Sequence, residues 1–184
     1  MQITRGNAES FKIRKARKAD MKAVLGLIND LAVFEKAPNA LIVTENDLVK
    51  DGFGKSPLFN VFIAEVKKEV VGMALIYTGY STWKGKLIYL DDLIVKEEYR
   101  NRGIGKLLLD KVIEYATKRK ARVLKWQVLR WNKDAIRFYN KYDSVVYDDE
   151  WVDCKMYEKD FKVNQRIYET IHPPGKIDSS YRSE

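Results

Sequence analysis

The sequence predicts a mixed α/β fold of seven strands and four helices. Two observations support this prediction. Apolar runs with the alternation or density of strands recur along the chain, and amphipathic segments with helical spacing lie between them. In chain order the elements are β, α, α, β, β, β, α, β, α, β, β, without an internal repeat or a low-complexity run.

The first two elements are a strand and a helix. Residues 11–16 (FKIRKA) alternate in polarity, which predicts a strand. Asp20 follows as a candidate cap for a helix. The helix is predicted from apolar residues that recur at helical spacing, namely Met21, Val24, Leu25, Ile28 and Leu31.

A capping pair begins the second helix. Thr44 is followed three residues later by Asp47, a spacing that lets each side chain bond the other residue's backbone N–H. Gly52 and Gly54 favour the end of this short helix.

The middle of the chain predicts three strands. Residues 58–66 and 69–80 form a hairpin about Lys67 and Lys68. Residues 86–95 (KLIYLDDLIV) form a long apolar strand that contains two adjacent aspartates.

The remaining elements alternate between helix and strand. A helix over residues 103–120 carries apolar residues along one face, and a strand over residues 122–129 follows. Asn132 then caps a helix within residues 131–143, and two last strands occupy residues 144–149 and 150–161.

Composition indicates one domain with a C-terminal tail. We expect the domain to cover residues 1–161 and the tail residues 162–184, which are poor in apolar residues and contain a Pro-Pro-Gly break. The tail is either mobile, docked or an arm for a partner. No apolar run approaches the roughly 20 residues of a membrane span, and the N-terminus lacks the apolar core of a secretory signal. We therefore expect a cytoplasmic protein.

The chain is basic, with a formal net charge of +8. This charge is explained either by solubility or by attraction to polyanions, such as nucleic acid or a phosphate-rich cofactor. The cations are spread along the chain, which weakens the case for nucleic acid. Cys154 is the only cysteine, so a disulfide framework and a cysteine-rich zinc site are excluded; we expect it to pack in the core.

Residues 99–106 (YRNRGIGK) join the aspartate-containing strand to the next helix. A helix N-terminus offers free backbone N–H groups, and glycines let a phosphate approach them. The P-loop and dinucleotide patterns do not fit, because Leu107 replaces the Ser/Thr of the first and Leu108 the third glycine of the second. The segment is either a phosphate or pyrophosphate site or a plain turn with solvated arginines.

This segment resembles a family signature. Arg100-x-x-Gly103-x-Gly105 is similar to the Arg/Gln-x-x-Gly-x-Gly/Ala motif of the GNAT N-acetyltransferase superfamily. DGFG, YSTWKGKLIYLDDLIV, YRNRGIG and WNKDAIRFY resemble, in the same order, its spermidine/spermine (diamine) and thialysine N-acetyltransferase branch. The resemblance spans residues 11–161 and implies the GNAT fold, a central mixed, mostly antiparallel sheet with helices on both faces.

The resemblance implies that acetyl-CoA is the cofactor and that CoA is the product. Main-chain groups of Leu93, Ile94 and Val95 would bind the pantetheine arm. Tyr139 would be the general acid toward the departing thiolate and would also contact the cofactor. The pyrophosphate would lie on Arg100, Asn101, Arg102, Gly103, Ile104, Gly105 and Lys106, and the next helix start would contribute Asn132, Lys133, Asp134 and Ala135. The family usually forms homodimers.

The chemistry needs a base for the acceptor amine, whose pKa of about 10.4 leaves it protonated at neutral pH. The only histidine, His172, lies in the tail, so carboxylates are the candidates. Asp91 matches the position of a family glutamate that accepts the proton, directly or through water. Because strand side chains alternate, we expect only one of Asp91 and Asp92 to face a given cleft.

The resemblance also implies a substrate site. Glu35 and Glu150 would bind the distal charge of a cationic amine. The polyamine enzymes have an acidic residue at the position that Ser81 occupies here, and this difference favours a short diamine or a lysine-like amine over spermine as the acceptor. The full predicted set is Phe34, Glu35, Ser81, Trp83, Asp91, Asp92 and Glu150, and no metal is expected.

The predicted activity is therefore transfer of an acetyl group from acetyl-CoA to a primary amine of a small diamine, polyamine or lysine analogue by direct attack. Two alternatives remain open at this point. One is a protein or peptide N-acetyltransferase of the same fold. The other is a non-catalytic, basic domain that binds nucleic acid.

Overall fold

The computed structural model describes residues 11–142, 145–147 and 156. The predicted tail, Glu150, Cys154 and most of the last two predicted strands lie outside these residues; residues 145–147 are described and do not form a strand. The chain divides into two compact units at the bond between Trp131 and Asn132. The first unit contains the sheet.

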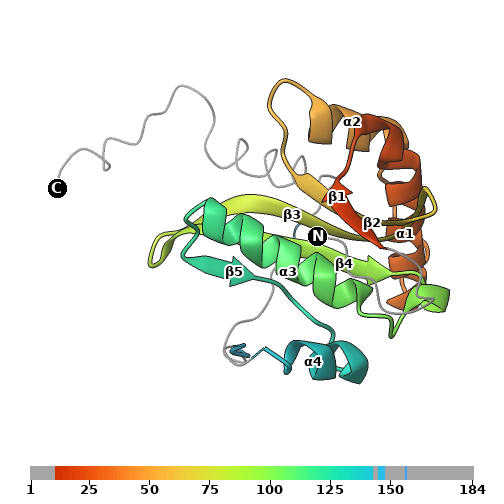
Figure 1. Ribbon diagram of the computed structural model, residues 1–184. Coiled ribbons are helices and arrows are strands. Elements are labelled where there is room, and N and C mark those ends of the chain that lie inside the picture. Colours follow the sequence, from red (N-terminus) through yellow and green to blue (C-terminus); the bar gives the residue numbers. More distant parts are fainter. Residues whose placement is uncertain (1–10, 143–144, 148–155, 157–184) are drawn as a thin grey trace, which may run out of the picture. The chain divides into compact units, whose positions relative to one another are not determined.

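The first unit is built on a mixed sheet with the strand order β1-β2-β3-β4-β5 (Figure 1). The first four strands pair antiparallel in sequence, and β5 joins the edge of β4 in parallel. This arrangement confirms the predicted mixed, mostly antiparallel sheet, although the described residues form five strands rather than seven. The strands are β1 (Lys12–Lys15), β2 (Asn60–Val66), β3 (Glu69–Ser81), β4 (Gly85–Val95) and β5 (Val123–Lys125).

Helices pack on both faces of this sheet, as predicted. On one face, Val61 and Ile63 of β2 join a core cluster with residues of α1 (Met21–Phe34) and α2 (Glu45–Phe53). On the other face, Phe62 packs edge-on against Tyr115 of α3 (Ile104–Lys118). The alternation of β2 between the two faces thus supports both layers. The second unit contains α4 (Lys133–Tyr139).

The predicted capping pair is present at the start of α2. Thr44 Oγ1 accepts a hydrogen bond from the Asp47 backbone N–H at 3.2 Å, and Asp47 Oδ2 accepts one from the Thr44 N–H at 2.9 Å. The helix runs through Gly52 and ends at Phe53.

The predicted cap at Asp20 is not formed. Its carboxylate instead binds the Arg14 guanidinium at 2.7 and 2.9 Å and accepts a bond from the Arg17 backbone N–H at 2.6 Å. A short 3₁₀ turn, Lys18–Asp20, precedes α1. The bidentate ion pair with the neighbouring strand is the stronger interaction for this carboxylate, so tertiary structure overrides the local capping preference.

The hairpin between β2 and β3 turns where predicted. Lys67 and Lys68 have φ values of 47° and 72°, the left-handed conformation that a two-residue hairpin turn requires. None of the helices within the described ranges is long and apolar enough to cross a membrane.

Candidate active site

A β-bulge in β4 turns two adjacent aspartates toward the same side of the sheet. Ile76 of β3 pairs with Leu90, but Leu75 pairs with Asp92, so Asp91 is the additional residue. A bulge of this kind interrupts the alternation of side chains along a strand. The expectation that only one of the two carboxylates could face a given cleft is therefore wrong, because it assumed a regular strand.

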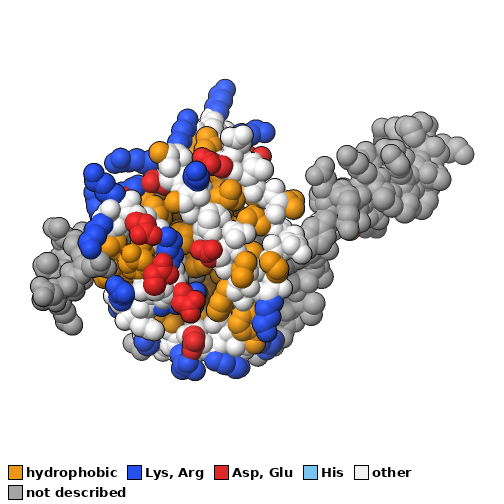
Figure 2. Space-filling model, turned by 90° about the vertical axis from the view of Figure 1, so that its right-hand side faces the viewer, with side chains coloured by type: hydrophobic (Ala, Val, Ile, Leu, Met, Phe, Trp, Pro, Cys, Tyr) orange, Lys and Arg blue, Asp and Glu red, His pale blue; other side chains and the backbone are white. Residues whose placement is uncertain are grey.

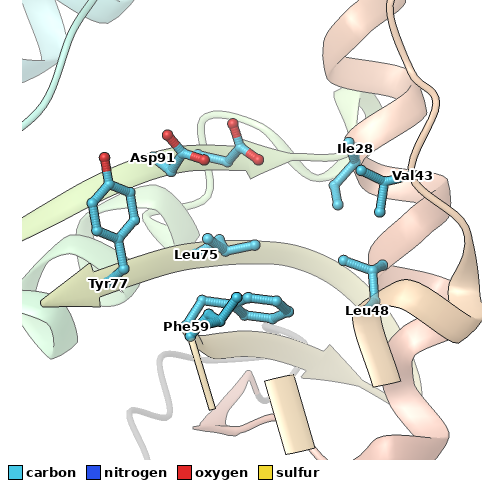
Figure 3. Close-up of a pocket in the computed structure, with 9 residues that line it drawn as sticks. Ile28, Val43, Leu48, Phe59, Leu75, Tyr77 and Asp91 are labelled. Atoms are coloured by element: carbon cyan, nitrogen blue, oxygen red, sulfur yellow. The ribbon is translucent and has the colours of Figure 1, made fainter. Parts of the chain in front are cut away.

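Both carboxylates line a cavity of about 410 Å³ on the α1 side of the sheet (Figure 3). Asp91 and Asp92 are the charged groups among its described lining residues, and Tyr77 lies beside them. The remaining wall is apolar and comes from α1, α2, β3 and the segments that flank α2, through Ile28, Val43, Leu48, Leu58, Phe59 and Leu75. The cavity suits a molecule with a cationic end and an apolar body.

The electrostatics of the pair favour a proton on one carboxyl group. Burial, and then the negative charges of Asp91 and Glu35, raise the pKa of Asp92 to about 7. Burial also raises the pKa of Asp91. Asp91 is exposed at the cavity, whereas Asp92 is partly buried. Asp92 is therefore poised to gain and lose a proton near neutral pH, as a general base requires.

Tyr77 forms one side of the carboxylate end. Its ring stacks on Tyr89 of β4, with the ring centroids 5.0 Å apart and an angle of 19° between the planes. Its hydroxyl points toward the side of the cavity that carries Asp91 (Figure 3). Burial, and then the charge of Asp91, raise the pKa of Tyr77. Tyr77 is not among the predicted site residues, although it lies two residues from Leu75 and thus on the same face of β3.

The surface around α1 and α2 is acidic, although the whole chain is basic. Acidic side chains gather across the middle of this face, with a few lysines and arginines among them and more toward its rim (Figure 2). Glu45 and Asp47 lie in the first turn of α2, and Glu35 is the cap residue at the end of α1. A local negative potential attracts cations even when the net charge is positive.

The segment before α3 has the backbone of an anion site. Asn101 and Gly103 have φ values of 61° and 83°, and α3 begins directly after Gly103. A Cβ at Gly103 would meet no atom within 4 Å, so open space lies in front of this backbone. The first N–H groups of a helix lack intrahelical acceptors and carry partial positive charge. This geometry fits a pyrophosphate.

The cations of this segment are held by the chain itself. Arg100 Nε donates to the Val95 carbonyl at 3.1 Å, and its guanidinium lies 5.3 Å from the centre of the Phe34 ring. Arg102 donates to the Glu98 carbonyl at 2.7 Å, and Lys106 pairs with Asp110 at 2.6 Å. A phosphate bound here would therefore be contacted mainly by backbone amides, and the cations would contribute a favourable field.

The edge of β4 next to this segment is open along part of its length. On that edge β5 pairs only with Leu87, Ile88 and Tyr89, whereas β3 pairs with β4 on the other edge as far as Val95. Within the described ranges, the β5-side edge of residues 91–95 has no strand partner. An extended amide-containing chain such as pantetheine could add to this edge by main-chain hydrogen bonds. The contacts of Leu93, Ile94 and Val95 with such a chain stay predictions.

Other predicted substrate residues of the first unit lie outside the cavity lining. Phe34 and Glu35 are at the end of α1, where the Phe34 ring lies 5.5 Å from that of Trp131. Ser81 and Trp83 are at the turn between β3 and β4; Ser81 Oγ accepts a bond from the Lys84 N–H at 3.2 Å, and Trp83 is largely exposed. Their contacts with substrate stay predictions.

The second unit presents the predicted helix start and Tyr139. Asn132 Oδ1 accepts a hydrogen bond from the Ala135 N–H at 3.1 Å and caps α4 as predicted. Lys133 and Asp134 form its first turn, and Asp134 pairs with Arg137. Tyr139 is buried, and burial together with Tyr147 raises its pKa to about 12. Its hydroxyl therefore keeps its proton at neutral pH.

Comparisons with known proteins agree with this geometry. The model of the Acetyltransferase (GNAT) family matches residues 29–143. A thialysine N-epsilon-acetyltransferase of Bos taurus is 41% identical over 135 residues, which cover 69% of this chain and 79% of that protein. A spermidine/spermine N(1)-acetyltransferase-like protein of Homo sapiens is 37% identical, over 70% of this chain but only 20% of its own length. A solved aminoglycoside N-acetyltransferase in complex with CoA shares the fold, with a TM-score of 0.65 at 17% identity, over 84% of this chain and 99% of that one.

Proposed function

Because the chain belongs to the acetyltransferase (GNAT) family, we propose that its acceptor is a small primary diamine or a lysine-like amine such as thialysine. The chain is an acetyl-CoA-dependent amine N-acetyltransferase. The observation that carries the choice of acceptor is the cavity with Asp91 and Asp92 at one end and apolar walls elsewhere. A narrow amine with an unbranched body satisfies both features, whereas a peptide would need an open groove.

Acetyl-CoA would supply the acetyl thioester, and CoA would leave as a thiolate that takes its proton from solvent once the amide has formed. We infer that the anion site before α3 holds the pyrophosphate, through residues 100–106, and that Leu93, Ile94 and Val95 hold the pantetheine arm. Asn132, Lys133, Asp134 and Ala135 are the second unit's candidates for cofactor contacts. The phosphate groups of the cofactor are anions, and the free backbone N–H groups at the N-terminus of α3 attract anions.

The aspartate pair handles the proton of the acceptor. The amine arrives as an ammonium ion, and the charge of the pair attracts it. Asp92 accepts the proton, directly or through water, because its pKa of about 7 lets it be unprotonated at neutral pH and still receive a proton. Asp91, assigned as the base from the family resemblance, keeps the ammonium ion in place and raises the pKa of its neighbour.

Tyr139 acts on the leaving group in this proposal. A thiol has a pKa of about 8.5, well below the value of about 12 for the buried Tyr139 hydroxyl. Complete proton transfer from Tyr139 to the thiolate is therefore uphill. The hydroxyl instead donates a hydrogen bond that stabilises the charge that develops on sulfur.

The pH profile tests the role of the pair. At saturating acetyl-CoA, kcat/KM for the amine should rise with pH through about 7, because the pair must lose a proton before it can accept one. Asp91→Asn should move this rise to lower pH, because it removes a like charge beside Asp92. Two acceptors of different amine pKa should give the same rise. A rise that follows the pKa of each acceptor instead would contradict the proposal.

Replacement of the Tyr139 hydroxyl tests the leaving-group contact. Tyr139→Phe should lower kcat about 100-fold, the usual cost of one hydrogen-bond donor to a developing anion, while the Kd for acetyl-CoA changes little. Tyr142→Phe is the matched control in the same unit, because it also removes a tyrosine hydroxyl and keeps the ring that packs edge-on against Phe138. Equal turnover in both variants would remove Tyr139 from the mechanism.

A panel of acceptors tests the function as a whole. Release of the CoA thiol is followed with putrescine, 1,3-diaminopropane, spermidine, spermine, lysine, thialysine and a basic peptide. Turnover that is highest for a short diamine or a lysine analogue is the expected result. Turnover with the peptide alone would contradict the proposal and favour a peptide N-acetyltransferase. Nucleic-acid binding that weakens steeply with salt, together with no turnover of any acceptor, would favour the non-catalytic alternative.

We also propose that the enzyme is a cytoplasmic homodimer. The resemblance to the diamine and thialysine acetyltransferases supports the dimer. Sedimentation equilibrium of the full chain measures it directly, and a monomer at micromolar concentration would contradict it.

A further inference from the structure

Phe59 lies in the walls of two cavities in the first unit. One of them is the substrate cavity. A second cavity of about 250 Å³ lies between the end of β1, the end of α2 and the start of β2, and its wall includes Lys15, Gly52 and Phe53. Phe59 is the residue that the described walls of the two cavities share.

The Phe59 ring is fixed in this position by α2. A Cβ at Gly52 would lie 2.8 Å from two atoms of the ring, so the ring edge packs directly against the helix backbone. Phe59 also packs on the core cluster shared by α1, α2 and the sheet. Such close packing holds an aromatic side chain in one rotamer, so the place of the Phe59 ring in both cavity walls is part of the folded structure.

Phe59 lies at the end of the substrate cavity away from the carboxylates. Asp91 is on β4, Leu75 on the neighbouring β3, and Phe59 directly before β2 on the far side of Leu75 (Figure 3). Two strand spacings separate β4 from β2, which is about 10 Å across the sheet. An extended chain of about eight bonds spans this distance.

We propose that Phe59 sets the maximum length of the acceptor by closing the substrate cavity against the second cavity. This inference rests on the proposed function, because it places the reacting amine at Asp91 and Asp92. An acceptor longer than about eight bonds must then bend or leave its far end in solvent. Removal of the ring would join cavities of about 410 and 250 Å³ and admit a longer chain.

Once Phe59 is removed, the second cavity should also discriminate between acceptors by the charge at their far end. Lys15, which is exposed, lies in its wall, whereas the charged groups in the described wall of the substrate cavity are the two aspartates. A long acceptor that ends in a carboxylate should therefore gain more from the opened cavity than one that ends in a second ammonium. The effect of one exposed lysine is small, about threefold.

The test compares short and long acceptors in Phe59→Ala. The acceptors are 1,4-diaminobutane, 1,10-diaminodecane and 10-aminodecanoic acid, each at saturating acetyl-CoA. The wild type should favour the short diamine in kcat/KM by at least about tenfold, and Phe59→Ala should reduce that ratio at least about tenfold. Phe59→Ala with Lys15→Gln should lose the additional gain of the aminodecanoate. Phe59→Leu, a smaller change, gives the same comparison if the alanine variant is poorly folded.

Phe53→Ala is the matched control. Phe53 is a phenylalanine of the same partial burial that borders the second cavity but not the first. The Phe53→Ala substitution should enlarge the second cavity and leave the Phe59 ring between the cavities. The ratio of kcat/KM for the short diamine to kcat/KM for the long diamine should therefore stay at the wild-type value. A folded Phe59 variant with the wild-type ratio, or a Phe53 variant that changes it equally, would overturn the inference while the function stands. A wild type that acetylates thialysine but none of these three amines would also overturn this inference alone. A wild type that acetylates none of the three, and neither lysine nor thialysine, would overturn the proposed function and this inference with it.

Discussion

Asp92→Asn should lower kcat about 10²–10⁴-fold and at the same time raise the melting temperature at pH 8. The first effect follows because an amide cannot accept the proton of the acceptor. The second follows because Asp92 is partly buried beside Asp91 and faces the charge of Glu35, so its ionised form is disfavoured in the folded protein. Steady-state kinetics and thermal unfolding of the same preparation measure both effects.

The sign of the stability effect depends on pH. The pKa of Asp92 is about 7 in the folded protein, above its ordinary value of 3.8. The folded state therefore binds the proton more tightly than the unfolded state, and stability falls as pH rises from about 4 to about 7. Asp92→Asn should be close to neutral for stability at pH 4. At pH 8 the melting temperature of this variant should exceed that of the wild type by about 2–4 °C for each kcal/mol of repulsion that the substitution removes.

Two further variants separate this account from a structural one. Asp30→Asn changes an exposed aspartate of α1 and should alter neither turnover nor the pH dependence of stability. Asp91→Asn should keep more activity than Asp92→Asn at pH 8. A structural role for Asp92 predicts a loss of stability on substitution at pH 8, and unchanged turnover would sink the assignment of the base.

The features of the site that depend on local sequence could be predicted. The Thr44–Asp47 capping pair, the turn at Lys67 and Lys68, and the Asn132 cap involve residues within a few positions of one another. Their geometry follows from side-chain chemistry and backbone preference alone. The family signature likewise identified the segment before α3, where the structure has left-handed Asn101 and Gly103.

The shared cavity of the two aspartates could not be predicted in this way. A bulge in β4 is a property of its register with β3, and the same residues in a regular strand would point to opposite faces. The ion pair that replaces the expected cap at Asp20 could not be predicted either, because its partner Arg14 lies on the neighbouring strand. Phe59 is a third case, because its role depends on how closely α2 approaches β2. In each case the outcome is decided by packing between elements.

Gly105→Glu should weaken acetyl-CoA binding at least about 100-fold, close to abolition, without loss of stability. The substitution places a carboxylate in the first turn of α3, where the pyrophosphate is proposed to bind, and such a juxtaposition of like charges costs several kcal/mol. The same carboxylate suits the helix itself, because glutamate has a higher helix propensity than glycine and a negative charge near the N-terminus is favourable by about 0.3–1 kcal/mol. Isothermal titration calorimetry with acetyl-CoA measures the loss.

Gly26→Glu is the matched control for this prediction. Gly26 lies within α1, is exposed, and a Cβ there would meet no atom within 4 Å. The same change of charge and of helix propensity is thereby made outside the anion site, so the Kd for acetyl-CoA should stay near the wild-type value. Both variants lower the net charge equally, which removes long-range electrostatics as an explanation. Normal affinity for acetyl-CoA in Gly105→Glu would contradict a pyrophosphate site at the start of α3. Equal loss of affinity in both variants would assign the effect to the overall charge.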